Sequence, residues 1–254
     1  MKAKIFGLLL FLAVTIKTEA QQFISKGTIE FEVTTNVKKT MGSGAFWDQL
    51  KDQMPDFKTA YYNLTFTDNK SLYKFNHYDE TKAKVPEFLR RNEDDNEWFY
   101  DFGTGQSSIQ KNTFGTLVNI KDSIRPISWK ITNESRVIAG FNCRKAIGQI
   151  MDSVYVFAFY TDEITVSGGP CSVNGLPGMI LGLTIPRLYI SMIATKLTLT
   201  DPKSADVKPV PVKKYYTAKQ RQQIIEDRLK EFTREDDDEN EKIWIKQMYW
   251  DTML

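Results

Sequence analysis

The sequence predicts a mainly β protein, an antiparallel and strongly curved sheet or open barrel of roughly eight to eleven strands. We expect a short helix after the first strand and an amphipathic helix near the C-terminal end. Three observations predict this class: repeated runs of alternating apolar and polar residues, two segments with apolar residues at helical spacing, and no linker or internal repeat along the chain. A single β-rich domain is therefore expected over residues 21–232.

The first predicted strand covers 27–35, where Ile29, Phe31 and Val33 alternate with polar residues. Ser43–Met54 follows, with apolar residues at helical spacing after a serine that can cap a helix, and it stops at Pro55. In 154–159 both alternating sets are apolar, which predicts a strand covered on both faces. The other strand-like runs, in chain order, are 59–67, 71–76, 97–102, 109–120, 127–131, 136–150, 153–161, 178–185 and 187–200.

The second helix is expected at 217–232, because Thr217 and Gln220 have the spacing of a capping box and an apolar stripe follows them. Residues 233–254 form an acidic and aromatic tail. Its apolar side chains either dock onto the domain or form an exposed patch for a partner. They are Ile243, Trp244, Ile245, Met248, Tyr249 and Trp250.

Residues 1–20 have the pattern of a signal peptide. Lys2 and Lys4 precede a mostly apolar run at 5–16, and Thr18-Glu19-Ala20 provides a cleavage site. The run is shorter than the roughly 20 residues that a membrane-spanning helix needs. We therefore expect an exported protein that begins at Gln21 or Gln22 and does not span a membrane.

The net charge of +2 comes from the signal peptide. Removing its three lysines and one glutamate from 34 basic and 32 acidic residues leaves 31 of each. A balanced chain gives no electrostatic reason to expect nucleic acid as a partner.

The two cysteines, Cys143 and Cys171, are first interpreted as a disulfide, because exported proteins fold in oxidising compartments. The alternative is two free buried thiols, since spacing alone does not show that their Cα atoms approach.

No constellation predicts catalysis, a cofactor or a metal. His77 is the single histidine and lies in a predicted strand, where a structural or surface role is expected. The carboxylate run at 93–97 matches no calcium loop and is expected to be a solvated loop.

The most constrained segment is 169–182, GPCSVNGLPGMILG. Pro177-Gly178 predicts a type II turn, because proline fixes φ at the second position and glycine tolerates positive φ at the third. The motif contains no proton donor, nucleophile or phosphate-binding spacing. Its residues are Gly169, Pro170, Gly175, Leu176, Pro177, Gly178, Met179 and Ile180.

This string resembles the signature of the GLPGLI family, exported bacterial envelope proteins of unknown function. Weaker matches at 137–146 and 159–161 occur in the expected order, and the resemblance spans roughly 23–232. Met179 replaces the leucine after GLPG, and Cys171 stands where the family pattern has no cysteine. The resemblance implies a mostly β domain in the periplasm or at the cell surface of a bacterium with an outer membrane. It assigns no chemical role to any residue.

Three functions remain open. The first is a non-catalytic binding or accessory module that acts through protein–protein contacts, with an outer-membrane transport protein as a candidate partner. The second is a carrier of an apolar small molecule such as a lipid, which predicts a cavity of several hundred Å³ beneath a helix. The third is a hydrolase that uses two converging carboxylates.

Overall fold

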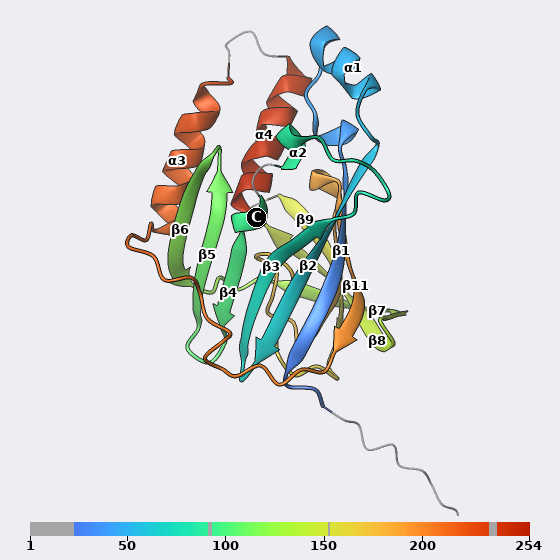
Figure 1. Ribbon diagram of the computed structural model, residues 1–254, viewed down its shortest axis with the longest axis vertical. Coiled ribbons are helices and arrows are strands. Elements are labelled where there is room, and N and C mark those ends of the chain that lie inside the picture. The colour runs from blue at the N-terminus through green and yellow to red at the C-terminus, as the bar shows by residue number, and fades with distance from the viewer. Residues whose placement is uncertain (1–22, 91–92, 152, 234–237) are drawn as a thin grey trace, which may run out of the picture.

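The computed structural model describes residues 23–90, 93–151, 153–233 and 238–254, and it confirms the predicted class (Figure 1). Eleven strands form one antiparallel sheet. The strands are β1 (Gly27–Asn36), β2 (Phe57–Thr67), β3 (Lys70–Tyr78), β4 (Glu97–Asp101), β5 (Gln106–Thr113), β6 (Thr116–Ser123), β7 (Trp129–Ile138), β8 (Phe141–Ile150), β9 (Val154–Thr161), β10 (Met179–Ile185) and β11 (Ile190–Thr198).

The sheet consists of two meanders joined in the middle. Its order is β6-β5-β4-β3-β2-β1-β11-β10-β9-β8-β7, so each strand pairs with its neighbour in sequence except at two places. The first and last strands, β1 and β11, pair with each other from Thr28↔Thr198 to Thr35↔Ile190. Strands β6 and β7, although consecutive, lie at the two opposite edges.

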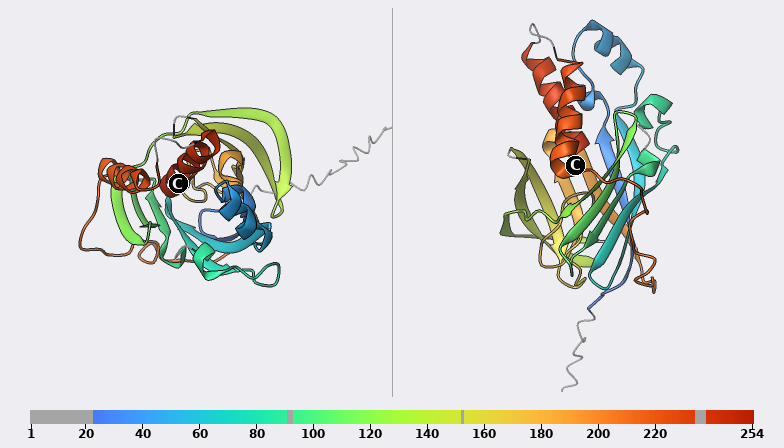
Figure 2. Two further views of the ribbon diagram at one scale, coloured as in Figure 1. Left: turned by 90° about the horizontal axis from the view of Figure 1, so that it is seen from above. Right: turned by 90° about the vertical axis from the view of Figure 1, so that its left-hand side faces the viewer.

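The short connection between these two edges explains the curvature. β6 ends at Ser123 and β7 begins at Trp129. Six residue steps span at most about 20 Å when fully extended. The end of β6 and the start of β7 must therefore lie near each other, and the sheet curls around its core without closing (Figure 2).

The core lies inside this curl. In β1 the residues alternate strictly between buried and half-buried, with Ile29 and Phe31 completely buried. β10 is buried at six of its seven positions. In β9, by contrast, Val154, Val156 and Ala158 are buried but Tyr155 is 55% exposed, so the expectation of a strand covered on both faces is wrong.

The helices gather at one end of the curled sheet (Figures 1 and 2). The predicted capping box of α3 is present: the Thr217 side chain accepts from the Gln220 N–H, and Gln220 reaches back to the Thr217 N–H. The aromatic tail forms a further helix, α4, which the sequence analysis did not predict. The helical segments are η1 (Lys38–Thr40), α1 (Ala45–Asp52), α2 (Glu87–Arg90), η2 (Glu93–Asp95), η3 (Pro186–Leu188), α3 (Ala218–Lys230) and α4 (Glu239–Met253).

The two edge strands of the sheet, β6 and β7, have different neighbours. β6 is covered by α3 and by a bridge to Tyr216, whose N–H donates to Asn119 O at 2.7 Å. Within the described residues, β7 pairs only with β8. Of the helices in the described part of the chain, none combines the length and apolar character needed to cross a bilayer.

Candidate functional site

A cavity of about 370 Å³ lies between the concave face of the sheet and the end of α4. Its walls come from β1 to β5, β11, η3, α4 and the loop that carries Cys171. Most of its lining is apolar, as small-molecule sites usually are. The main apolar contributors are Val33, Ala60, Trp98, Leu188, Met192 and Met248.

An aromatic row crosses three strands, β2, β3 and β4, along this cavity. The Tyr62 and Tyr73 rings stack with centroids 4.9 Å apart, and the Tyr73 and Trp98 centroids are 5.6 Å apart. The row ends at Lys111 of β5, whose Nζ lies 5.8 Å from the centroid of Trp98. The strand register produces this row, because Tyr73 is paired with Trp98 and Trp98 with Ile109, two residues before Lys111.

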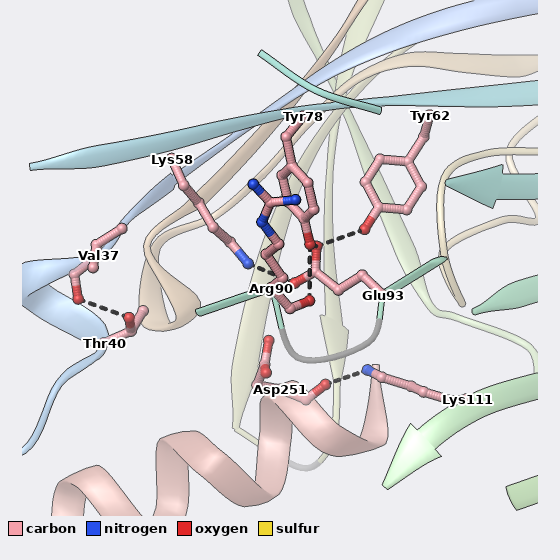
Figure 3. Close-up of polar contacts among 9 residues, drawn as sticks. All are labelled: Val37, Thr40, Lys58, Tyr62, Tyr78, Arg90, Glu93, Lys111 and Asp251. Carbon is pink, nitrogen blue, oxygen red and sulfur yellow. Dashed lines mark hydrogen bonds and ion pairs between the residues drawn. The ribbon is translucent and has the colours of Figure 1, made fainter. Parts of the chain in front are cut away.

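A polar cluster surrounds Glu93 of η2 (Figure 3). Lys58 Nζ lies 2.5 Å from Glu93 Oε1, and the hydroxyls of Tyr62 and Tyr78 each lie 3.1 Å from Oε2. Burial is the main cause that raises the pKa values of both tyrosines above the ordinary value, so both phenols stay protonated and donate. The cluster fixes η2 at the border of the cavity.

This cluster corrects the expectation of a solvated loop at 93–97. Glu97 is 3% exposed and accepts a hydrogen bond from the Val210 N–H at 2.8 Å. Glu93 is also largely covered. Their partners lie far away in the sequence, so charge alone did not reveal them. No group of three or more histidine, cysteine or carboxylate residues suited to a metal occurs in the described ranges.

The C-terminal end of α4 is held by donors from four separate segments. Lys111 Nζ donates to Asp251 O at 2.5 Å (Figure 3), and Arg221 of α3 donates to Thr252 O. Trp98 Nε1 donates to Leu254 O at 3.0 Å, and the Ser172 hydroxyl donates to the same oxygen. Carbonyls in the last turn of a helix lack intrahelical partners, so these donors satisfy them and dock α4.

Two cationic side chains are buried beside this helix end. Lys111 is 9% exposed and Arg221 is 5% exposed. Burial lowers the pKa of Lys111 to about 8 and that of Arg221 to about 10. Neither forms an ion pair with any carboxylate of the described residues. Both cations are therefore largely shielded from water beside the end of α4.

The predicted Cys143–Cys171 disulfide is wrong, because both residues are free buried thiols. Cys171 lines the cavity near Lys111, with φ of 53° in the turn that the Val173 N–H closes onto Pro170 O. Cys143 lies on β8 near Arg136, with its sulfur 3.5 Å from Phe141 O. Burial raises the pKa values to about 11 for Cys143 and about 12 for Cys171, so both stay protonated at neutral pH.

The motif residues do not line the cavity, and Leu176, Met179 and Ile180 belong to the hydrophobic core. Six of them are buried, and Gly175 and Pro177 are exposed. The expected type II turn is replaced by a tighter one, in which the Gly178 N–H donates to Leu176 O at 2.7 Å. The reason is that the Met179 N–H, which would close a type II turn, instead donates to Ile164 O at 3.2 Å.

The remaining residues from the sequence analysis lie elsewhere. His77 is exposed and stacks on Tyr61, with ring centroids 4.8 Å apart. Of the aromatic tail, Trp250 is 3% exposed and packs on the core, and Trp244 donates to Thr40 O at 3.2 Å, so the tail is docked. Residues 1–20 lie outside the described residues.

Lys111 and Tyr73 were not among the residues predicted from the sequence. A signal existed for Lys111: in 109–113 it takes the same inward position as Ile109 and Thr113, which places one charge on a buried face. No comparable signal marked Tyr73, because a tyrosine on a strand is ordinary.

A family model described as a protein of unknown function (Porph_ging) matches residues 148–182. This range contains the Cys171 loop and the glycine-rich motif. No curated protein matches the chain.

Among solved structures, two of PNGF-II, in space groups C2 and P21, are similar at 14% identity, with TM-scores of 0.49 and 0.48. They cover 76% and 78% of this chain, which spans 31% and 33% of theirs. An uncharacterized conserved protein from Thermus thermophilus is similar at 7% identity and a TM-score of 0.37, over 76% of this chain and 90% of its own. Likenesses this distant support no statement about function.

Proposed function

We propose that this chain is a non-catalytic binding protein that holds a small amphipathic molecule in the cavity beneath α4. The observation that carries the proposal is the cavity itself, about 370 Å³ with apolar walls and a few polar groups. Ligand sites in proteins have roughly this size and composition, about 300–1,000 Å³. A sheet whose concave face was filled by aromatic side chains would leave no such space.

The proposed role is non-catalytic because neither the Cys171 thiol nor the Glu93 carboxylate at the cavity is set up as a nucleophile or base. The Cys171 thiol is held protonated by its burial, and a neutral thiol is a poor nucleophile. Glu93 is engaged by Lys58, Tyr62 and Tyr78. Export through residues 1–20, and with it a location in the bacterial envelope and membership of the GLPGLI family, stays a prediction from the sequence.

A cavity-filling variant tests this function. Ala60→Phe places a ring into the cavity from β2, whereas Asn63→Phe adds the same ring to the half-exposed face of the same strand. The neutral fluorescent probe N-phenyl-1-naphthylamine is titrated into the wild-type protein and both variants. We expect saturable one-site binding to the wild type, at least about tenfold weaker binding to Ala60→Phe, and an unchanged affinity for Asn63→Phe.

Circular dichroism and thermal melting verify that both variants fold. Equal affinity of a folded Ala60→Phe protein and the wild type, or absence of saturable binding to the wild type, would contradict the proposed function.

Fewer observations support the alternative function, an accessory module that acts through protein–protein contacts. The aromatic tail was its candidate contact, and the structure docks that tail through Trp250 and Trp244. A protein-sized companion in native mass spectra of the protein from its own source would support that interpretation over the binding of a small molecule.

A further inference from the structure

We propose that the ligand of this cavity is a single-chain molecule with a carboxylate head, and that Lys111 and Tyr73 bind the head. This inference rests on the proposed function and names the ligand class. Three observations carry it: the unused donors of a buried ammonium, an unpartnered buried phenol at the same cavity, and the volume.

The Lys111 ammonium has N–H donors for which the described residues provide no acceptor. An ammonium group carries three N–H donors. Its Nζ makes one hydrogen bond, to Asp251 O, and no carboxylate of the described segments lies within ion-pair distance. Burying a charge is costly unless it is paired and hydrogen-bonded. A carboxylate in the cavity would supply the missing charge and acceptors.

The charged groups near Lys111 come from the elements packed around it. They are Asp251 on α4, Glu93 on η2 and Arg221 on α3, with the protonated Cys171 thiol beside them. Glu93 is paired with Lys58. Neither carboxylate reaches the Lys111 ammonium at ion-pair distance, so a carboxylate head in the cavity would be its direct anionic partner.

A second buried polar group, the hydroxyl of Tyr73, belongs to a residue that lines the same cavity. Its side chain is 1% exposed and lines the cavity, and its hydroxyl has no hydrogen-bond partner among the described residues. An unsatisfied buried hydroxyl costs roughly 1–3 kcal/mol. Burial raises its pKa well above the ordinary value, so it stays protonated and can donate to an anionic oxygen.

The volume of the cavity restricts the ligand further. The volume of about 370 Å³ lies near the lower end of ligand sites. It therefore favours one hydrocarbon chain over the two chains of a phospholipid.

The test compares two probes that share a chain and differ in the head. Dodecanoate and dodecan-1-ol are titrated at pH 7, below the concentration at which dodecanoate forms micelles, with tryptophan fluorescence as the readout because Trp98 lines the cavity. We expect the wild-type protein to bind dodecanoate at least about tenfold more tightly. Lys111→Met should reduce the ratio of the two affinities to about one, while its affinity for dodecan-1-ol stays unchanged.

Tyr73→Phe provides a second variant with a matched control. It removes the hydroxyl alone, and it should weaken dodecanoate binding by about threefold or more. Tyr160→Phe removes another buried hydroxyl without a partner in the described structure, from a side chain that does not line the cavity, and it should leave both affinities unchanged.

The outcomes separate the two proposals. If the wild-type protein bound dodecanoate and dodecan-1-ol with equal affinity, and Lys111→Met did the same, the carboxylate head would be overturned. The cavity would still be a ligand site. Failure of both probes to bind the wild type would overturn the proposed function as well. Tighter binding of a two-chain phosphatidylglycerol than of dodecanoate would overturn the single-chain carboxylate.

Discussion

Gly175 and Gly178 belong to one loop and both have positive φ, but their surroundings differ. A Cβ on Gly178 would lie 2.0 Å from the main-chain oxygen of Thr161, whereas a Cβ on Gly175 would meet its nearest atom at 3.9 Å. Gly175→Ala should therefore cost only the backbone penalty, about 1 kcal/mol of the free energy of unfolding. Gly178→Ala also forces the backbone apart and should cost about 3 kcal/mol or more, measured by urea denaturation. Equal costs for the two variants would show that the close approach does not matter.

Lys111 gives the stability of the protein a pH dependence. Its pKa is lowered by burial from 10.5 to about 8, which corresponds to roughly 3 kcal/mol of destabilisation while it is charged. Between these pH values the folded protein has lost the proton and the unfolded chain still binds it, so unfolding takes up a proton and stability rises with pH. Below about pH 8 both states are protonated and the dependence vanishes.

Denaturation of the wild type and of Lys111→Met at pH 7.5 and pH 9.5 measures this effect. Without ligand, the variant should be more stable than the wild type at pH 7.5, by about 1–3 kcal/mol, and the difference should shrink at pH 9.5. A difference that stays constant with pH would show that Lys111 does not titrate in this range.

Trp250 and Ile243 separate the buried and exposed faces of α4. Trp250 is 3% exposed, with its ring 5.6 Å from the Arg187 guanidinium, whereas Ile243 is 47% exposed. Trp250→Ala should lower the free energy of unfolding by about 3 kcal/mol, because it leaves a large cavity under the helix. Ile243→Ala should change it by less than about 1 kcal/mol. A melting temperature unaffected by Trp250→Ala would mean that α4 is not part of the cooperative fold.

Elements with a clean local signal were predicted, and those without one were not. The alternation in 27–35 and the Thr217–Gln220 capping box identified β1 and α3. α4 has a capping box too, from Asp238 to Glu241, but the apolar residues after it cover more than one face and show no stripe.

Two hairpin turns were missed for a related reason. Residues 109–120 and 136–150 were each predicted as one run, but they are divided by turns at Phe114-Gly115 and Ala139-Gly140, with positive φ at all four residues. Such turns normally begin with Asn, Asp or Gly, so a Phe or Ala at the first position gave no warning.

At the scale of the whole molecule, the curved sheet followed from the sequence but the cavity did not. Periodicity reports which face of a strand is buried, and it does so one strand at a time. The cavity combines side chains from several strands and helices that meet only through strand register and the docking of α4. Lys111 and Tyr73 are separated in sequence and line the same cavity only when β3, β4 and β5 pair.

The pairing of β1 with β11 has a consequence for how the chain folds. These strands are about 150 residues apart, so the central seam of the sheet closes a long loop and contributes to slow folding. During synthesis, at about 5–20 residues per second, β11 leaves the ribosome roughly 10–30 s after β1. Until then the first meander carries β1 as an open edge, and the strand at the middle of the finished sheet is the one that waits longest for its second neighbour.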